Sequence, residues 1–375
     1  MSGTTEGPGV AIERGTIIVY RIFDVAEKFD LKRIESDLGA GLASSRLKLA
    51  RNTGHALILR DPPITLSLGA AQLRLGAATV RTELFARVWS YGVLSLQFNV
   101  QIERGTTWTA LVATAAHVED ENAIDTVALA RVSELSNTLG AAATLPHDPQ
   151  GMEDYVVYFL EELSGIELPG ELASRADIPA LILGEPIQTL SDDVRLPILN
   201  SRLSYSTRDL TVIDWNSALV IDPEGSRDVA DMLEFAATHL MELRYFDTLL
   251  DDRLEALYYA IEHHHRLRSF FRSDSDRLSH EATSLYVEFS QHVERVENSL
   301  KFVGDFFLAT VFRQAANRFQ LKEWEDNVMR KVNALARVSE VLSEETNVRR
   351  SHMLEIIIIL LILYEIVHAA MGSGR

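Results

Sequence analysis

The sequence predicts an α+β fold: an amino-terminal mixed α/β domain, followed by long antiparallel coiled-coil-like helices and a single carboxy-terminal transmembrane helix. Three observations predict it. The first 222 residues hold short β-branched and aromatic runs separated by Gly and Pro. After Pro223 no Pro occurs, and apolar residues recur about every 3.5 positions. An unbroken apolar run extends from Ile356 to Tyr364. We therefore divide the chain into 1–12 (disordered), 13–222 (α+β domain), 223–350 (helical domain), 351–371 (transmembrane helix) and 372–375 (tail).

Composition excludes several classes of function. The 375 residues include 36 Lys and Arg, 54 Asp and Glu, and no Cys, which gives a net charge of −18. Disulfides, thiolate metal sites and cysteine nucleophiles are absent. An acidic surface repels nucleic acid at long range, and the sequence has no local basic patch, so we expect no direct nucleic-acid binding.

The amino-terminal half mixes strands and helices irregularly. Its β-branched and aromatic runs predict strands at 16–23, 55–59, 64–68, 79–88, 91–100 and 155–160, and a pair between 203 and 221. Helical spacing predicts helices at 27–38 and 107–139, and 146–151 is a connection. Several strands are neighbours in hairpin-like order, which favours α+β over a doubly wound parallel sheet. This half contains no phosphate-binding loop, nucleophile elbow or zinc-protease motif, so the sequence predicts a non-enzymatic protein without cofactor or metal.

Three apolar runs, which begin at Leu233, Leu278 and Leu321, predict three long antiparallel helices that join copies into a homo-oligomer. Asp247 occupies a position of the first run where the spacing requires an apolar residue. A lone polar residue in such a seam can specify register. We therefore predict a buried network of Glu242, Arg244 and Asp247 with a role in assembly or switching. The alternative is that the seam drifts and Asp247 is hydrated.

The carboxy-terminal segment is the strongest single signal. Eleven Leu, Ile and Val residues lie between 354 and 371. Together they favour insertion into a bilayer, and their free energy of insertion outweighs the cost of the one carboxylate near the centre. Arg349 and Arg350 flank the segment and, by the positive-inside rule, keep the amino-terminal domain in the cytoplasm. The prediction is a single-pass tail anchor in the inner (cytoplasmic) membrane, in contact with lipid. The alternative is a buried helix at the centre of a soluble oligomer.

Three ionisable residues lie in or beside this apolar segment: Glu355, Glu365 and His368. Glu365 and His368 are one helical turn apart, so they can pair inside an oligomer, and such residues mark functional sites in membranes. We predict a role for all three in oligomerisation or within the membrane. The alternative is that Glu365 and His368 reach the far interface and water.

Two segments, Ser90–Leu94 (SYGVL) and Asn347–Val367 (NVRRSHMLEIIIILLILYEIV), resemble the Required for Meiotic Nuclear Division family, a domain of unknown function in bacteria and mitochondria. That family ends in a charged helix, a Leu-Glu pair, an Ile-rich span and an internal Glu. The matching residues here are Arg350, Leu354, Glu355, Ile356 to Leu363 and Glu365, although Ile356 stands where the family usually has Trp. The resemblance implies a membrane-anchored, oligomeric, non-enzymatic protein and supplies no catalytic residues.

The order of the predicted parts also resembles that of CorA-type magnesium channels. Those channels end in two spans with a Gly-Met-Asn loop, whereas this chain has one predicted span and Met371-Gly372-Ser373. We therefore expect a membrane-anchored oligomeric scaffold or sensor of unknown ligand. The alternative is an ion-permeation or gating protein in which Glu365 and His368 line an oligomeric pore.

Overall fold

The computed structural model describes residues 9–37, 44–47, 61–76, 78–119, 122–185, 190–263, 283–287, 289–291, 293–294, 306–337, 355 and 358–363. The chain forms two compact units. The first comprises Met1–Tyr245 and Glu294–Trp324, and the second comprises Phe246–Val293 and Glu325–Arg375. The long helix α7 (Asp228–His263) contributes to both.

The first unit is built on one mixed sheet, which has ten strands in the described residues and the order β2-β3-β4-β5-β1-β7-β10-β9-β8, with β6 paired to β1. Neighbouring strands are antiparallel except for the parallel pair of β7 and β10. The strands are β1 (Ala11–Phe29), β2 (Ser44–Arg46), β3 (Ile64–Leu75), β4 (Ala78–Val88), β5 (Val93–Gln101), β6 (Thr106–Thr107), β7 (Ala143–Ser164), β8 (Arg202–Leu203), β9 (Leu210–Ile213) and β10 (Ser217–Ile221).

Alternation along the central strands gives the sheet two different faces. On β5, Leu94, Leu96 and Phe98 belong to the main hydrophobic core, whereas the buried Ser95 and Gln97 point to the other side. On β4, Leu84 and Ala86 likewise belong to the core and Arg87 points to the other side, whereas β1 is mixed, since Arg21 lies on the core side and the apolar Ile18 and Ile22 on the other. One face of the sheet is therefore largely apolar, and the opposite face buries several polar side chains.

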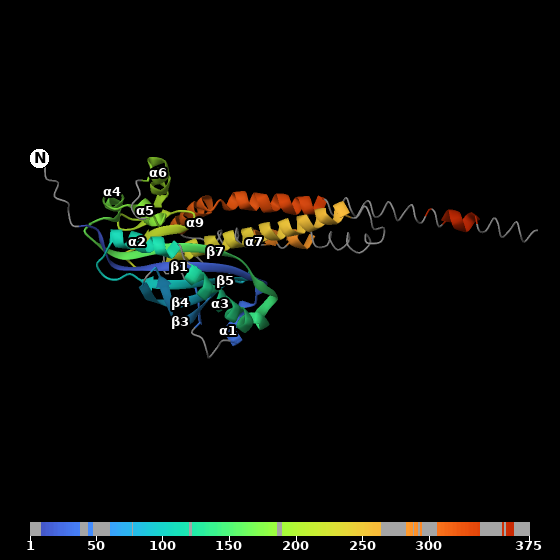
Figure 1. The fold of residues 1–375 in the computed structure, drawn as a ribbon, viewed down its shortest axis with the longest axis horizontal. Helices are drawn as coiled ribbons and strands as arrows, with labels where there is room; N and C mark the ends of the chain where they lie inside the picture. Colours follow the sequence, from blue (N-terminus) through green and yellow to red (C-terminus); the bar gives the residue numbers. More distant parts are fainter. Residues whose placement is uncertain are drawn as a thin grey trace, which may run out of the picture. The chain divides into compact units, whose positions relative to one another are not determined.

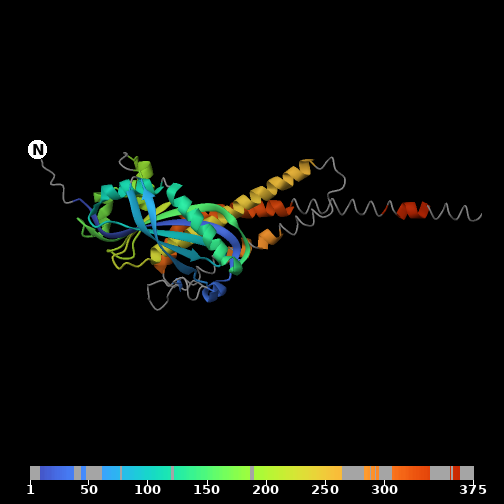
Figure 2. The same cartoon turned by 60° about the horizontal axis from the view of Figure 1, so that its bottom comes forward.

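Helices α2 (Trp108–Glu119) and α3 (Asn122–Leu139) cover the apolar face, where α3 lies across the strands (Figure 2). Ile124, Ala128 and Val132 of α3 recur at helical spacing and are fully buried in the core. On this face Arg21 of β1 pairs with Asp125 of α3 at 2.7 Å. Short helical segments complete the unit: η1 (Gly140–Ala142), η2 (Pro169–Glu171), α4 (Leu172–Arg175), α5 (Ile178–Ile182) and α6 (Asp192–Asn200).

The opposite, polar face carries the first part of α7 together with α9 (Phe306–Arg318) (Figure 1). Every residue of α7 from 228 to 243 is buried, so this part of the helix is enclosed on all sides. The ring of Phe235 lies 5.6 Å from that of Trp89 beside the sheet and 5.5 Å from that of Phe312 on α9. The helix is thus packed between the sheet and α9.

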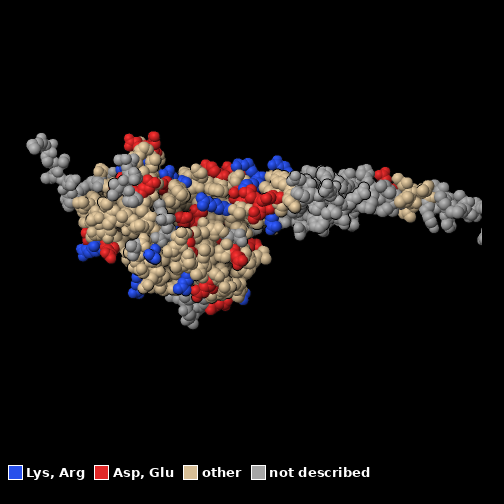
Figure 3. Space-filling model, in the orientation of Figure 1, with Lys and Arg blue, Asp and Glu red and all other residues tan. Residues whose placement is uncertain are grey.

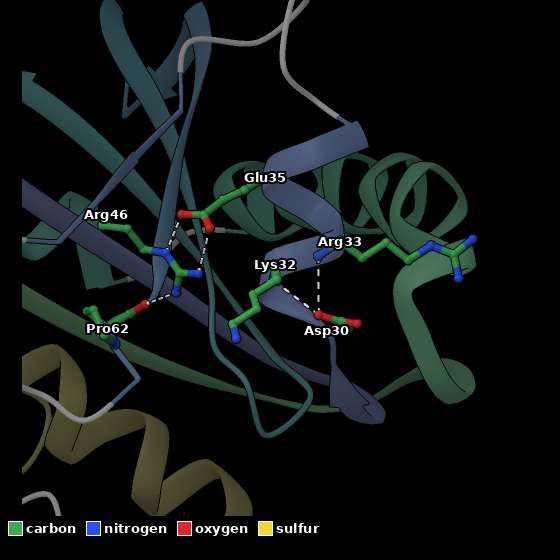
Figure 4. A network of polar contacts seen from close by, with 6 residues as sticks. All are labelled: Asp30, Lys32, Arg33, Glu35, Arg46 and Pro62. Atoms are coloured by element: carbon green, nitrogen blue, oxygen red, sulfur yellow. Dashed lines mark hydrogen bonds and ion pairs between the residues drawn. The ribbon is translucent and has the colours of Figure 1, made fainter.

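The short helix α1 (Leu31–Asp37) and the edge strand β2 are joined by polar contacts (Figure 4). Asp30 caps the helix, because its carboxylate accepts hydrogen bonds from the backbone amides of Lys32 (3.1 Å) and Arg33 (3.2 Å). Arg46 on β2 forms a bidentate pair with Glu35 and donates to the carbonyl of Pro62 at 2.7 Å. These contacts anchor the sheet edge.

Several elements differ from their predicted bounds. The helix predicted at 27–38 is shorter, since β1 continues to Phe29, and the helix predicted at 107–139 is two helices, α2 and α3. Strand β7 includes the predicted connection 146–151. Its pairing with the long strand β1 is irregular there, with register shifts near Pro146 and Gly151. The predicted strand 55–59 lies outside the described residues.

The second unit is helical in its described residues. The rings of Phe246 and Phe289 meet edge to face at 5.4 Å. Helix 321–337 begins in the first unit and continues into the second, where Lys331 pairs with Asp247 and with Asp251, each at 2.7 Å. Asn327 donates to Asp247 at 2.6 Å. These contacts join α7 to helix 321–337.

The predicted transmembrane helix at 351–371 is wrong for the described part of the chain, in which no helix is both long enough and apolar enough to cross a bilayer. The described helical run there is 358–363.

Candidate functional site

The most unusual group of side chains among the described residues is a buried ionic cluster, which we define as Tyr20, Arg87, Asp231 and Glu234. Tyr20 on β1 and Arg87 on β4 belong to the polar face of the sheet, and the two carboxylates come from α7. Arg87 Nη2 lies 2.7 Å from Asp231 Oδ1, and Arg87 Nη1 donates to Glu234 Oε2. The side chains of Arg87 and Asp231 are each 7% exposed, and that of Glu234 is fully buried.

Burial dominates the electrostatics of this cluster. It raises the pKa of Glu234 to about 7, although Arg87 and Ser95 favour the ionised carboxylate. Burial also raises the pKa of Asp231, again against the effect of Arg87. The pKa of Tyr20 is raised by burial and by Glu234. One guanidinium thus faces two carboxylates, of which one is close to protonation at neutral pH.

Further polar contacts join α7 to the sheet along its length. Tyr91 and Thr238 share a hydrogen bond of 2.7 Å between their hydroxyls. Arg244 pairs with Glu153 of β7 at 2.6 Å, and burial raises the pKa of Glu153 to about 7. The ring of His147 stacks on that of Tyr245 at 5.6 Å. These contacts fix the rotation and register of the helix on the sheet.

The cluster can exchange a proton but has little access for a substrate. Glu234 has no exposed side-chain surface, and Tyr20 is also fully buried. Within the described residues, no group of three His, Asp or Glu side chains is arranged to hold a metal ion. The cluster is therefore a buried ionic contact between α7 and the sheet.

The site residues predicted from the sequence fall into two groups. Glu242 is buried on α7, Arg244 pairs with Glu153, and Asp247 pairs with Lys331. Glu355 is described and exposed. Four residues lie outside the described residues: Arg349, Arg350, Glu365 and His368. Their predicted roles in assembly and in flanking or lining a membrane stay predictions.

The buried ionic cluster was not predicted from the sequence. A signal was present, because Asp231, Glu234 and Thr238 recur at steps of 3 and 4, which is the spacing of one helix face. Arg87 interrupts the apolar stretch of β4 in the same way. The pairing itself joins residues 147 positions apart, and no local pattern encodes it.

Together these features define a class: an α+β protein with a ten-stranded mixed sheet in its described residues, helices on both faces, and an ionic cluster buried beneath a long helix. Residues 14–228 match the family described as "Uncharacterized protein MJ0711, N-terminal domain". The chain belongs to this family.

A curated relative is also similar to this chain. Uncharacterized protein MJ0711 of Methanocaldococcus jannaschii is 24% identical over 219 residues, which are 58% of this chain and 66% of the relative. The match thus spans about two thirds of the relative's length. No solved structure matches the chain.

Proposed function

We propose that this protein is a self-associating, non-enzymatic scaffold or sensor, in which the carboxy-terminal helical segment joins several copies and the α+β unit presents a binding surface. One observation supports self-association above the others. Ile358 to Leu363 form a helical run of six large aliphatic residues, and each is between 51% and 60% exposed.

An exposed aliphatic run of this kind is expected to be buried against another surface. Six consecutive positions include every side of a helix, because successive side chains are about 100° apart. A helix that is apolar all round is normally enclosed by other protein or by lipid. The described helices of the chain are not long and apolar enough to span a bilayer, so we propose other copies of the same helix as the cover.

Three further features support the proposal. The coiled-coil spacing of the predicted helical half is typical of proteins that associate through helices. The resemblance of Asn347–Val367 to the Required for Meiotic Nuclear Division family also implies an oligomer without catalytic residues. A scaffold or sensor role agrees with the burial of the ionic cluster, which leaves its carboxylates with little access to a substrate.

Light scattering of the full chain tests the proposal. We expect a mass that is a multiple of the monomer mass of 41.9 kDa. Replacing Ile359, Leu360 and Ile362 with Gln keeps good helix formers but removes the apolar surface, and is expected to yield monomers. The matched control is Leu129→Gln on α3, where a Leu that is 48% exposed is replaced in the first unit.

The control protein should keep the wild-type mass. A monomeric wild-type chain, or a triple variant that keeps the wild-type oligomer, would show that these residues do not hold copies together.

On the face drawn in Figure 3, the described acidic and basic side chains are interspersed, and acidic ones gather at α6. This pattern is that of a hydrated surface rather than of a phosphate-binding stripe. It supports a partner that is a protein or a small molecule rather than a nucleic acid.

A further inference from the structure

A pocket of about 200 Å³ lies in the first unit, away from the buried ionic cluster. Residues of several short elements line it: Gly170 of η2, Ile178 of α5, Leu199 of α6, Arg202 of β8, and Leu210 and Val212 of β9, with Ser204 beside β8. Typical ligand pockets have volumes of roughly 300–1,000 Å³, so a pocket of about 200 Å³ is small. The space therefore suits a small molecule rather than a polymer.

The pocket has an apolar wall and a cationic, hydroxylated rim. Ile178, Leu210 and Val212 are 1%, 4% and 1% exposed, so they form a fixed wall that is part of the main core. Arg202 and Ser204 are exposed. The side chain of Arg202 makes neither a hydrogen bond nor an ion pair with any described residue, which leaves its guanidinium donors available to a ligand.

This combination selects a ligand class. A guanidinium binds a carboxylate through two parallel hydrogen bonds, and a serine hydroxyl can donate a third. The apolar wall binds a short hydrocarbon part and disfavours a fully hydrated anion. We propose that this pocket binds a small amphiphilic carboxylate, with its carboxylate on Arg202 and Ser204 and its apolar part against Ile178, Leu210 and Val212.

The surroundings of the pocket agree with an amphiphile. Leu168, Leu196 and Tyr205 lie one to three positions from lining residues in the chain, and they are 44%, 54% and 64% exposed. Exposed apolar residues near a concave site are typical of binding regions. The proposal goes beyond the proposed self-association, because every lining residue belongs to the first unit and none lies in the apolar helix.

Two variants test the site in different ways. Arg202→Met removes the charge and keeps much of the apolar stem. Gly170→Leu adds a bulky side chain at a residue that lines the pocket, where a Cβ meets no atom within 4 Å, and is designed to obstruct it. The matched control is Arg208→Met, because Arg208 is also exposed and its side chain is also unpaired within the described residues, but it does not line the pocket.

The experiment is a titration of the full chain with hexanoate, followed by ligand-detected nuclear magnetic resonance, with hexanol as the uncharged counterpart. We expect saturable binding of hexanoate, a loss of roughly tenfold in affinity in Arg202→Met and in Gly170→Leu, wild-type affinity in Arg208→Met, and weaker binding of hexanol. Thermal unfolding of each variant confirms that it is folded.

Three results would overturn the proposal: no saturable hexanoate binding by the wild type, equal losses in the Arg202 and Arg208 variants, or hexanol bound as tightly as hexanoate. Repeating the titration on the triple variant of the apolar helix separates the two proposals. Hexanoate binding there should be unchanged, whatever the oligomeric state.

Discussion

The buried ionic cluster gives a prediction in which pH decides the size of the effect. Arg87→Met leaves Asp231 and Glu234 inside the protein without their guanidinium partner. Breaking a buried pair by removing one member costs about 3–5 kcal/mol. The structure gives a similar scale: a pKa of about 7 for Glu234, against an ordinary 4.5, corresponds to about 3 kcal/mol at 1.36 kcal/mol per pKa unit, even with Arg87 present.

The direction with pH follows from the raised pKa. The folded state holds protons on these carboxylates more tightly than the unfolded chain, so their contribution to stability is present below the unfolded pKa and is lost as pH rises through the folded pKa. Without Arg87 the folded pKa of Glu234 rises further. We therefore expect Arg87→Met to lower the free energy of unfolding by about 3–5 kcal/mol at pH 8 and by roughly 1–2 kcal/mol at pH 5.

Urea unfolding followed by tryptophan fluorescence measures this effect, because all four Trp residues belong to the first unit. Glu234→Gln should stay within about 1 kcal/mol of the wild type at pH 8, since it removes a charge that burial already disfavours. The control is Arg104→Met, which removes an exposed pair with Glu13 and should leave stability unchanged. An equal loss at pH 5 and pH 8, or no loss at either, would refute the reasoning.

Two further predictions concern backbone geometry and the helical unit. Gly92→Ala should lower the free energy of unfolding in urea by more than about 3 kcal/mol, because a Cβ at this residue (φ +95°) would lie 1.5 Å from the carbonyl oxygen of Ala26. The control Gly105→Ala (φ +81°), where a Cβ meets no atom within 4 Å, should cost about 1 kcal/mol. Similar costs for the two variants would contradict this prediction. Lys331→Met removes the cation between Asp247 and Asp251 and should speed amide hydrogen exchange at the contact of α7 with helix 321–337; unchanged exchange there would show that the pairs contribute nothing.

Sequence patterns predicted those elements whose side chains alternate or repeat regularly. The β-branched run 16–23 lies inside β1, the predicted strand 91–100 overlaps β5 except for its first two residues, and α7 begins near the predicted turn after Asp222. Strand β7 was predicted too short, because Pro146 and Gly151 are typical of turns. Gly151 has a φ of +68° and lies at a register shift, and the strand resumes its pairing with the long strand β1 on either side of it.

The candidate site was harder to predict, since it depends on contacts between distant residues. Arg87 and Glu234 meet because α7 crosses the polar face of the sheet, which no local window reveals. Asp247 was recognised as unusual in the helical seam, but its contact with Lys331 joins residues 84 positions apart. The transmembrane prediction rested mainly on hydropathy, and hydropathy does not distinguish an apolar helix in lipid from one enclosed by protein.

Self-association through residues 358–363 is the central claim, and the absence of cysteine from the chain allows a direct measurement of it. A single Leu361→Cys substitution places one thiol on the apolar helix, and Leu129→Cys places one on α3 as the control. Under mild oxidation we expect the Leu361 variant to form disulfide-linked dimers rapidly at low protein concentration, and the Leu129 variant to form few. Equal and slow cross-linking of both variants would contradict the claim that copies meet at this helix.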